Sequence, residues 1–331
     1  MKTSISASVY NSLREAGSKN VLLAVSGGAD STAMLRLAAE CRDELGINLT
    51  AAHLNHMVRG NAAKADADWL SVLCESLKIP FIVEEFDVPA YVTENNVGFE
   101  EAARNIRYAF LDRVAISRKC EAVAVAHSAN DVAETVLHNL LRGTGISGLR
   151  GIPKERTLTN GTRIIRPLLS VSRSEIIEYL ESLGQDFRID ATNVDTDITR
   201  NRIRCDLLPK LRSDYNRHVD SALVRLAKQA EDMQNAMMFV ARNLAFDVRG
   251  DASDADWSIR WQELQSHPVH LLREMFVAIW IELGWPRQKM TFEHWNRLAT
   301  MIKTGGKIQF PGFIDAWRTG GLLRLRKRRQ P

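Results

Sequence analysis

Runs of apolar residues alternate with segments of helical periodicity over the first two thirds of the chain. Val21–Val25 is apolar at every position, which is typical of a strand buried on both faces of a sheet. Strands that alternate with helices predict a parallel sheet with right-handed crossovers. The predicted strands are 21–25, 47–54, 81–86, 122–126 and one that begins at 164, and the predicted helices are 31–45, 62–77, 99–117 and 131–141.

The pattern changes after Pro209. Helical spacing then dominates, a polar and breaker-rich loop interrupts it, and a Gly-Gly pair introduces a hairpin-like end. We therefore predict an α/β domain over 1–212 and a smaller, mostly helical domain over 213–331. The predicted elements of the second domain are helices over 219–244, 270–283 and 291–302, the loop 250–256, and strands over 307–310 and 322–325.

Composition agrees with a globular protein of two domains. The chain has 331 residues, of which 45% are hydrophobic and 25% charged, and a domain takes about 150 residues. The richest apolar run, Met275–Leu283, is far shorter than the ~18 residues of a membrane span, and the first twenty residues lack a signal-peptide core. The four cysteines are scattered, which argues against a disulfide framework, a zinc ribbon or a CxxC redox site. We expect a cytoplasmic protein with reduced thiols and no membrane partner.

Positive charge is concentrated at the end of the chain. The net charge is only +4, yet eight lysines and arginines follow Met301, against Asp315 alone. Such a segment binds phosphate backbones by displacing condensed counterions. A solvated tail that keeps the protein in solution is the other interpretation.

A loop with the chemistry of an anion site follows the first predicted strand. It has neither the GxxxxGK[ST] of a P-loop nor GxGxxG. Its two glycines let backbone N–H groups face an anion, and the next helix adds the partial positive charge of its N-terminus. Asp30 beside a phosphate indicates a bridging Mg²⁺, whereas a plain strand-to-helix turn would use it as a cap. The phosphate-binding residues we expect are Ser26, Gly27, Gly28, Ala29, Asp30 and Ser31.

The pattern SGGxDS resembles the PP-loop of the N-type ATP pyrophosphatases, which cleave ATP between the α- and β-phosphates. The resemblance implies a parallel-sheet fold of the adenine nucleotide α-hydrolase type. Further segments, in their order and spacing, closely resemble the tRNA(Ile)-lysidine synthase family over about 18–212, and more weakly to the basic end. These segments are His53–Gly60, Glu100–Leu111, Ala126–Leu149, Ile165–Leu169 and Ile189–Arg204.

The family resemblance implies a ligase reaction in two steps. ATP adenylates the C2 carbonyl oxygen of the wobble cytidine in a tRNA(Ile) with a CAU anticodon, and pyrophosphate is released. The amine of free L-lysine then attacks C2 and expels AMP, which leaves lysidine. The implied cofactors are ATP and Mg²⁺, and the implied partners are tRNA(Ile) and lysine. The oligomeric state is open, a homodimer included.

Site roles follow from the same resemblance. Glu100 and Arg104 share a helix face, where a surface ion-pair ladder is the alternative. Asp131 and Glu134 open a helix, where capping is the alternative. We expect catalytic roles for Asp30, Glu100, Arg104, His127 and Asp131, and an ATP contact from His53. Substrate or tRNA contacts are expected from Arg107, Glu134, Arg142, Asp190, Asn193, Arg200, Asn201, Arg202 and Arg204.

Two positions depart from the family pattern. Ser128 stands where a second histidine is common, and Val132 stands where glutamine is common. Ser128 keeps a hydroxyl donor but loses an imidazole that could bond a phosphate or move a proton. We expect the position to support nucleotide binding rather than chemistry.

Three other functions compete with this interpretation. A PP-loop enzyme that thiolates tRNA generally uses cysteines, and no cysteine pair exists here. A small-molecule PP-loop synthetase would leave the arginine-rich segment 200–204 and the basic end unexplained. A non-catalytic protein that binds nucleotide and RNA would not need the complete Ser26–Ser31 loop.

Overall fold

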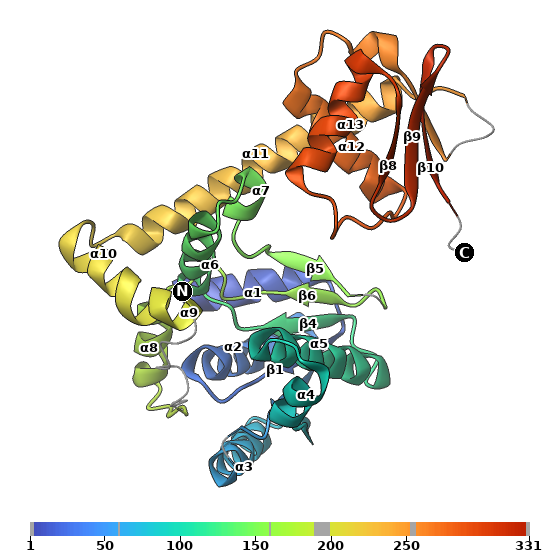
Figure 1. Ribbon diagram of the computed structural model, residues 1–331. Coiled ribbons are helices and arrows are strands. Elements are labelled where there is room, and N and C mark those ends of the chain that lie inside the picture. Colours follow the sequence, from blue (N-terminus) through green and yellow to red (C-terminus); the bar gives the residue numbers. More distant parts are fainter. Residues whose placement is uncertain (1–2, 59, 159, 189–198, 252–255, 329–331) are drawn as a thin grey trace. The chain divides into compact units, whose positions relative to one another are not determined.

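The computed structural model describes residues 3–58, 60–158, 160–188, 199–251 and 256–328. The chain forms two compact units, Met1–Lys228 and Gln229–Pro331, and the division falls inside the long helix α11 (Val219–Asp247). Each unit has its own sheet and its own hydrophobic core (Figure 1). No helix among the described residues is both long enough and apolar enough to cross a membrane.

The first unit is built on a six-stranded sheet with the order β3-β2-β1-β4-β6-β5. Five strands are parallel, as predicted, and only the edge strand β5, which the sequence pattern did not reveal, runs antiparallel to β6. The chain leaves β1 on one side for β2 and β3 and returns on the other side at β4. Ligands of such sheets bind outside the carboxyl ends of the strands at this reversal. The strands are β1 Asn20–Ala24, β2 Asn48–Asn55, β3 Phe81–Glu85, β4 Ala122–Val125, β5 Glu155–Thr157 and β6 Arg163–Ile165.

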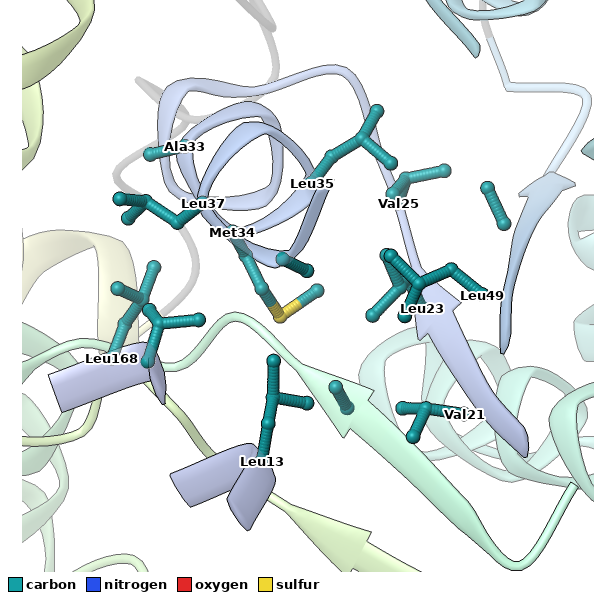
Figure 2. Packing of buried hydrophobic residues seen from close by; sticks show 14 of the residues in the cluster. Leu13, Val21, Leu23, Val25, Ala33, Met34, Leu35, Leu37, Leu49 and Leu168 are labelled. Atoms are coloured by element: carbon teal, nitrogen blue, oxygen red, sulfur yellow. The ribbon is translucent and has the colours of Figure 1, made fainter. Parts of the chain in front are cut away.

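Helices cover both faces of the sheet, which explains why β1 is apolar throughout. Val21, Leu23 and Val25 face a core shared with α1, α2 and α8, and Figure 2 shows Leu23 and Val25 beside the apolar side chains of α2. Leu22 faces the other core, beneath α5. The helices are α1 Ser4–Ala16, α2 Ala29–Leu45, α3 Asn61–Ser76, α4 Val88–Asn95, α5 Phe99–Ser117, α6 Ala129–Leu141, α7 Ile146–Leu149 and α8 Arg173–Ser182.

A separate apolar cluster joins α6 to the chain that follows Thr199. Val132 and Val136 of α6 pack with Ile203, Leu208 and the start of α11. This cluster holds α9 (Thr199–Arg202), a π-helical turn (Ile203–Leu207) and α10 (Leu208–Asp214) against the helix that follows β4. The arginines of the segment 200–204 are therefore positioned beside α6.

The second unit combines helices with a four-stranded antiparallel sheet of order β7-β10-β9-β8. Its core contains Trp280, whose ring lies edge-on to those of Trp285 and Trp295 at centroid distances of 4.9 and 5.3 Å. The predicted strands near 307 and 322 exist, but they do not pair with each other, because the unpredicted β9 lies between them. The elements are α12 Val269–Glu282, α13 Phe292–Thr304, β7 Trp257–Arg260, β8 Lys307–Phe310, β9 Ile314–Thr319 and β10 Leu322–Lys327.

Candidate active site at the carboxyl ends of β1 and β4

The loop after β1 is held in shape by hydrogen bonds from its own residues and from its neighbours. Gly27 has φ 85°, which a glycine adopts without strain, and its carbonyl accepts from the Thr32 hydroxyl at 3.1 Å and from the Arg188 N–H at 2.9 Å. Ser31 Oγ accepts from the Ser26 N–H at 3.1 Å and donates to the Gly28 carbonyl at 3.0 Å. Gly28 is the N-cap of α2 and has no side chain to cap it. The first amide groups of α2 have no intrahelical acceptor, so the loop has the form of an anion site.

Asp30 lies in the first turn of α2 and is paired with an arginine from α8. Its carboxylate Oδ1 lies 2.5 Å from Arg173 Nη1, and 24% of the Asp30 side chain is exposed. Burial raises the pKa of Asp30 above its usual value, and the charge of Arg173 opposes this rise. The charges of Asp131 and Arg204 also act on it, which places the carboxyl ends of β1 and β4 in one electrostatic site. Arg173 is not among the predicted site residues.

His127 follows β4 and is neutral at physiological pH. Burial lowers its pKa to about 4, and the positive charge of Arg166 acts in the same direction while Asp131 opposes it. Arg166 Nε donates to His127 Nδ1 at 3.2 Å, and Arg166 Nη1 donates to the Pro153 carbonyl at 2.7 Å. Because Nδ1 accepts, the ring carries its proton on Nε2. The imidazole is therefore suited to donate a hydrogen bond rather than to act as a cation.

Asp131 and Glu134 of α6 bind the arginines of the segment 200–204. Arg204 donates two hydrogen bonds to Glu134, from Nε to Oε1 at 2.6 Å and from Nη2 to Oε2 at 2.9 Å. Its Nη2 also donates to Asp131 Oδ1 at 3.2 Å. Arg200 Nε reaches Glu134 Oε2 at 3.4 Å. The Glu134 side chain is only 3% exposed. The structure thus brings together four of the predicted site residues as one ion-pair cluster.

Both departures from the family pattern serve local structure. The Ser128 N–H and hydroxyl both donate to Asp131 Oδ2, at 2.8 and 3.0 Å, and so close the N-terminus of α6. Val132 is buried in the apolar cluster with Ile203, and Gly151 approaches it so closely that an added Cβ would lie 3.1 Å from Val132 Cγ1. A glutamine at 132 would lose this apolar packing, so each departure fits its own surroundings.

The helix α5 presents the predicted substrate-handling face to solvent. Glu100, Arg104 and Arg107 are all exposed, and the structure records no ion pair between Glu100 and Arg104 among the residues it describes. The Arg104 guanidinium instead lies over the Tyr108 ring, 5.0 Å from its centroid. The positive charge of Arg107 helps burial to lower the pKa of His56 to about 4, which places Arg107 near the carboxyl end of β2.

The remaining predicted residues are scattered around this edge of the sheet. His53 is buried beside the loop, and its Nδ1 lies 2.9 Å from the Val25 carbonyl, to which it donates. Arg142 and Arg202 are exposed, Asn201 is half-buried, and Arg202 donates to Thr199. Asp190 and Asn193 lie outside the described residues.

Sequence reasoning missed the residues that hold the predicted ones in place. Arg166 orients His127, and Arg188 lies across Gly27 while its Nε pairs with the buried Asp66 at 2.6 Å. Arg173 opens α8, whose start does carry a recognisable signal. Ser172 and Glu175 form the S-x-x-E capping box, so the position of Arg173 at a helix start was available in the sequence.

Removing Arg204 should destabilise the first unit. Arg204→Ala leaves Glu134 buried with the longer contact to Arg200. We expect the free energy of unfolding to fall by about 3 kcal/mol. This value is near the lower end for broken buried ion pairs, because the Arg204 side chain is itself 41% exposed. Urea unfolding at pH 7 measures it. Arg202→Ala, which removes an exposed neighbour, is the matched control and should cost under ~0.5 kcal/mol. Equal losses for the two variants would contradict a structural role for the pair.

The neutral His127 predicts a pH dependence of stability. Its pKa of about 4 in the folded chain lies below the usual histidine value of 6.5, so the unfolded chain binds the proton first as pH falls. The stability that the neutral imidazole of His127 gives the folded chain is complete above pH 6.5 and is lost as the pH falls toward 4. Urea unfolding between these values should show a shallower pH slope for His127→Asn than for the wild type. His218→Asn, which changes an exposed histidine, should keep the wild-type slope; an unchanged slope in His127→Asn would refute the prediction.

Comparison with known proteins places these features in a family. Residues 1–211 match the family model described as the PP-loop domain. A tRNA(Ile)-lysidine synthase of Rhodopirellula baltica is 34% identical over 319 residues, which cover 85% of this chain and 79% of that protein. One from Clostridioides difficile is 40% identical over 207 residues, but the match covers 62% of this chain and 44% of the relative, so the chain spans less than half of that relative's length.

A solved structure supports the fold independently of close sequence similarity. The U34-tRNA thiolase of Methanococcus maripaludis aligns with a TM-score of 0.55 over 68% of this chain and 76% of its own, at 22% sequence identity. The shared fold, the SGGxDS loop at the strand reversal and the extent of the match to Rhodopirellula baltica lead to one conclusion. The chain belongs to the tRNA(Ile)-lysidine synthase family of PP-loop proteins.

Proposed function

We propose that this chain joins lysine to C2 of the wobble cytidine of a tRNA(Ile) with a CAU anticodon, at the expense of ATP. The observation that supports this most directly is the Ser26–Ser31 loop, which leads into an uncapped helix N-terminus next to β4 in a chain of this family. In the first step the cytidine O2 bonds to the α-phosphorus, and the bond to pyrophosphate breaks. In the second step the lysine amine attacks C2, and AMP leaves with the C2 oxygen.

The site fits a catalyst that works by positioning and charge rather than by a covalent intermediate on the protein. The amide groups at the start of α2 suit the phosphates, and the neutral His127 offers an Nε2–H donor that Arg166 orients. Glu100 and Arg104 remain our proposed contacts for the lysine amine and the cytidine, supported by their exposure on one face of α5. The alignment of three reactants accounts for much of the rate in such reactions.

We propose Asp30 as the Mg²⁺ ligand of the ATP complex. Its carboxylate lies in the first turn of α2, directly after the Ser26–Gly28 turn. Mg²⁺ is commonly bound by one or two carboxylates, with phosphate oxygens and water as its other ligands. The residues present therefore fit such an ion, which would supply charge neutralisation at the phosphates.

We further propose that the predicted domain 213–331 binds tRNA through the outer face of its sheet. Along β9 and β10, Ala316 and Leu325 face the core, so Trp317 and Arg324 face the other side, directly opposite each other. On the other side of β9, Lys307 of β8 stands opposite Trp317 in the strand pairing. The Arg326 guanidinium lies 5.5 Å from the Trp317 ring centroid. Basic groups around an aromatic ring suit a phosphate backbone and its bases. A cytoplasmic location and a homodimer stay predictions.

The proposed reaction predicts a new nucleoside. The full chain, incubated with ATP, Mg²⁺, lysine and an unmodified CAU tRNA(Ile) transcript, should raise the mass of the wobble cytidine by the mass of lysine less one water. Mass spectrometry of the nucleosides checks this, with a transcript that carries uridine at the wobble position as the control. A wobble cytidine that stays unmodified, in a preparation that binds ATP, would contradict the proposal.

The basic sheet face predicts a selective loss of tRNA binding. A variant with Lys307→Gln and Arg326→Gln should bind tRNA about tenfold or more weakly at moderate salt, because each lost phosphate contact reduces the counterions released. Its ATP affinity should stay the same. Filter binding at several salt concentrations measures both the affinity and the salt slope. Arg242→Gln with Arg297→Gln, two exposed arginines on α11 and α13, is the control; equal losses in both variants would count against this face.

A further inference from the structure

Arg173 stands on the rim of the site, between the two strand ends that form it. It is the first residue of α8, and its backbone N–H donates to Asn130 Oδ1 at 2.8 Å. The neighbouring Val171 carbonyl accepts from the Ala129 N–H at 2.9 Å, so the start of α8 is tied to the start of α6. From there the side chain reaches Asp30 in the loop, with 2.5 Å between Nη1 and Oδ1. The backbone of Arg173 is fixed while its guanidinium spans to the phosphate-binding loop.

The pair with Asp30 is easily exchanged. The Arg173 side chain is 45% exposed, whereas Asp30 Oδ1 is a buried atom that lies 2.5 Å from Arg173 Nη1. The arginine end of the pair is therefore open to a second anion. A guanidinium binds phosphate through two parallel N–H bonds of fixed geometry, which is a stronger interaction. A phosphate that enters the loop would therefore draw Arg173 away from the carboxylate.

Three of the other arginines near the loop and β4 are bound to groups that would be left unpaired without them. Arg166 is buried and bound to His127 and a backbone carbonyl. Arg188 donates a hydrogen bond to the buried Asp66, and Arg204 donates two hydrogen bonds to Glu134. Moving any of these guanidiniums to a phosphate would leave a buried carboxylate or imidazole without its partner. Arg173 can change partners when a cation replaces it on Asp30, because the Arg173 side chain is 45% exposed and Asp30 is the proposed Mg²⁺ ligand.

We propose that Arg173 is a catalytic residue that leaves Asp30 to bind the β- and γ-phosphates of ATP and stays on pyrophosphate as it departs. The inference rests on the proposed function only in taking ATP as substrate. As the cytidine O2 forms its bond to the α-phosphorus, the bond from that phosphorus to the bridging oxygen breaks, and the electron pair goes to pyrophosphate. The guanidinium neutralises the charge that gathers there. Without nucleotide, Arg173 neutralises Asp30 instead.

Pyrophosphate binding tests this without tRNA or lysine. Isothermal titration of the full chain with pyrophosphate and Mg²⁺ should show about tenfold or weaker affinity for Arg173→Gln, because a charge-assisted fork is lost. Arg173→Lys, which keeps the charge and loses the fork, should fall between. AMP, which lacks the β- and γ-phosphates, should bind all three within about twofold. Arg113→Gln is the matched control, since Arg113 also lies 2.5 Å from a carboxylate, that of Glu84 on β3, and is exposed.

A role of Arg173 as counter-ion alone predicts the opposite change in pyrophosphate affinity. If Arg173 served only as the counter-ion of Asp30, Arg173→Gln would free the carboxylate for Mg²⁺, and pyrophosphate would bind equally well or more tightly. That result would overturn the inference, and so would a wild-type chain that binds no pyrophosphate. Equal loss of AMP and pyrophosphate binding would mean general damage to the site and would also count against it. Lysidine formation is measured separately, so a chain that makes no lysidine but shows the selective loss keeps the inference and loses the proposed function.

Discussion

The site depends on the burial of β1 on both faces. Val21 and Leu23 face one core and Leu22 the other, so the strand cannot slip by one residue without moving apolar side chains from one core to the other. This register fixes where the strand stops, and the loop after it must turn at once into α2. The backbone of Gly27 makes that turn, and two donors hold its carbonyl. An anion site formed by backbone amides is thus placed by hydrophobic packing rather than by the polar residues that bind the ligand.

The carboxyl end of β4 is organised by charge. Glu134 is almost fully buried, and a buried carboxylate is stable only when it is paired. Arg204 supplies the pair, and the apolar cluster of α6 with Ile203 and Leu208 brings Arg204 to it. Asp131 links this cluster to the cap of α6 through Ser128. The chain after Thr199 therefore contributes to the site through α6.

Local patterns predicted the parallel strands of the first unit but not its helices α1, α4 and α8, and they missed β9 in the second unit. The parallel strands are continuous apolar runs, which a short window of sequence reveals, whereas β9 alternates buried Ile314 and Ala316 with the less buried Asp315 and Trp317. The loop Ser26–Ser31 could be recognised because its chemistry is contiguous. The partners of Glu134 could not, because Arg200 and Arg204 are 66 and 70 residues away and a helix start full of arginines is equally consistent with solvation. The sequence also could not show that Ser128 caps α6, since a serine before a helix has several roles.

The charges of the ion-pair cluster at the two strand ends offset one another. Asp30, Asp131 and Glu134 carry three negative charges, and Arg173, Arg200 and Arg204 balance them, so this cluster offers an incoming anion no net attraction. The backbone amides of α2 supply a partial charge of only about +0.5. Under our proposal, Mg²⁺ would take the place of Arg173 on Asp30, and the freed guanidinium would bind phosphate oxygens. The proposed exchange thus needs only two side chains, with α8 holding one and α2 the other.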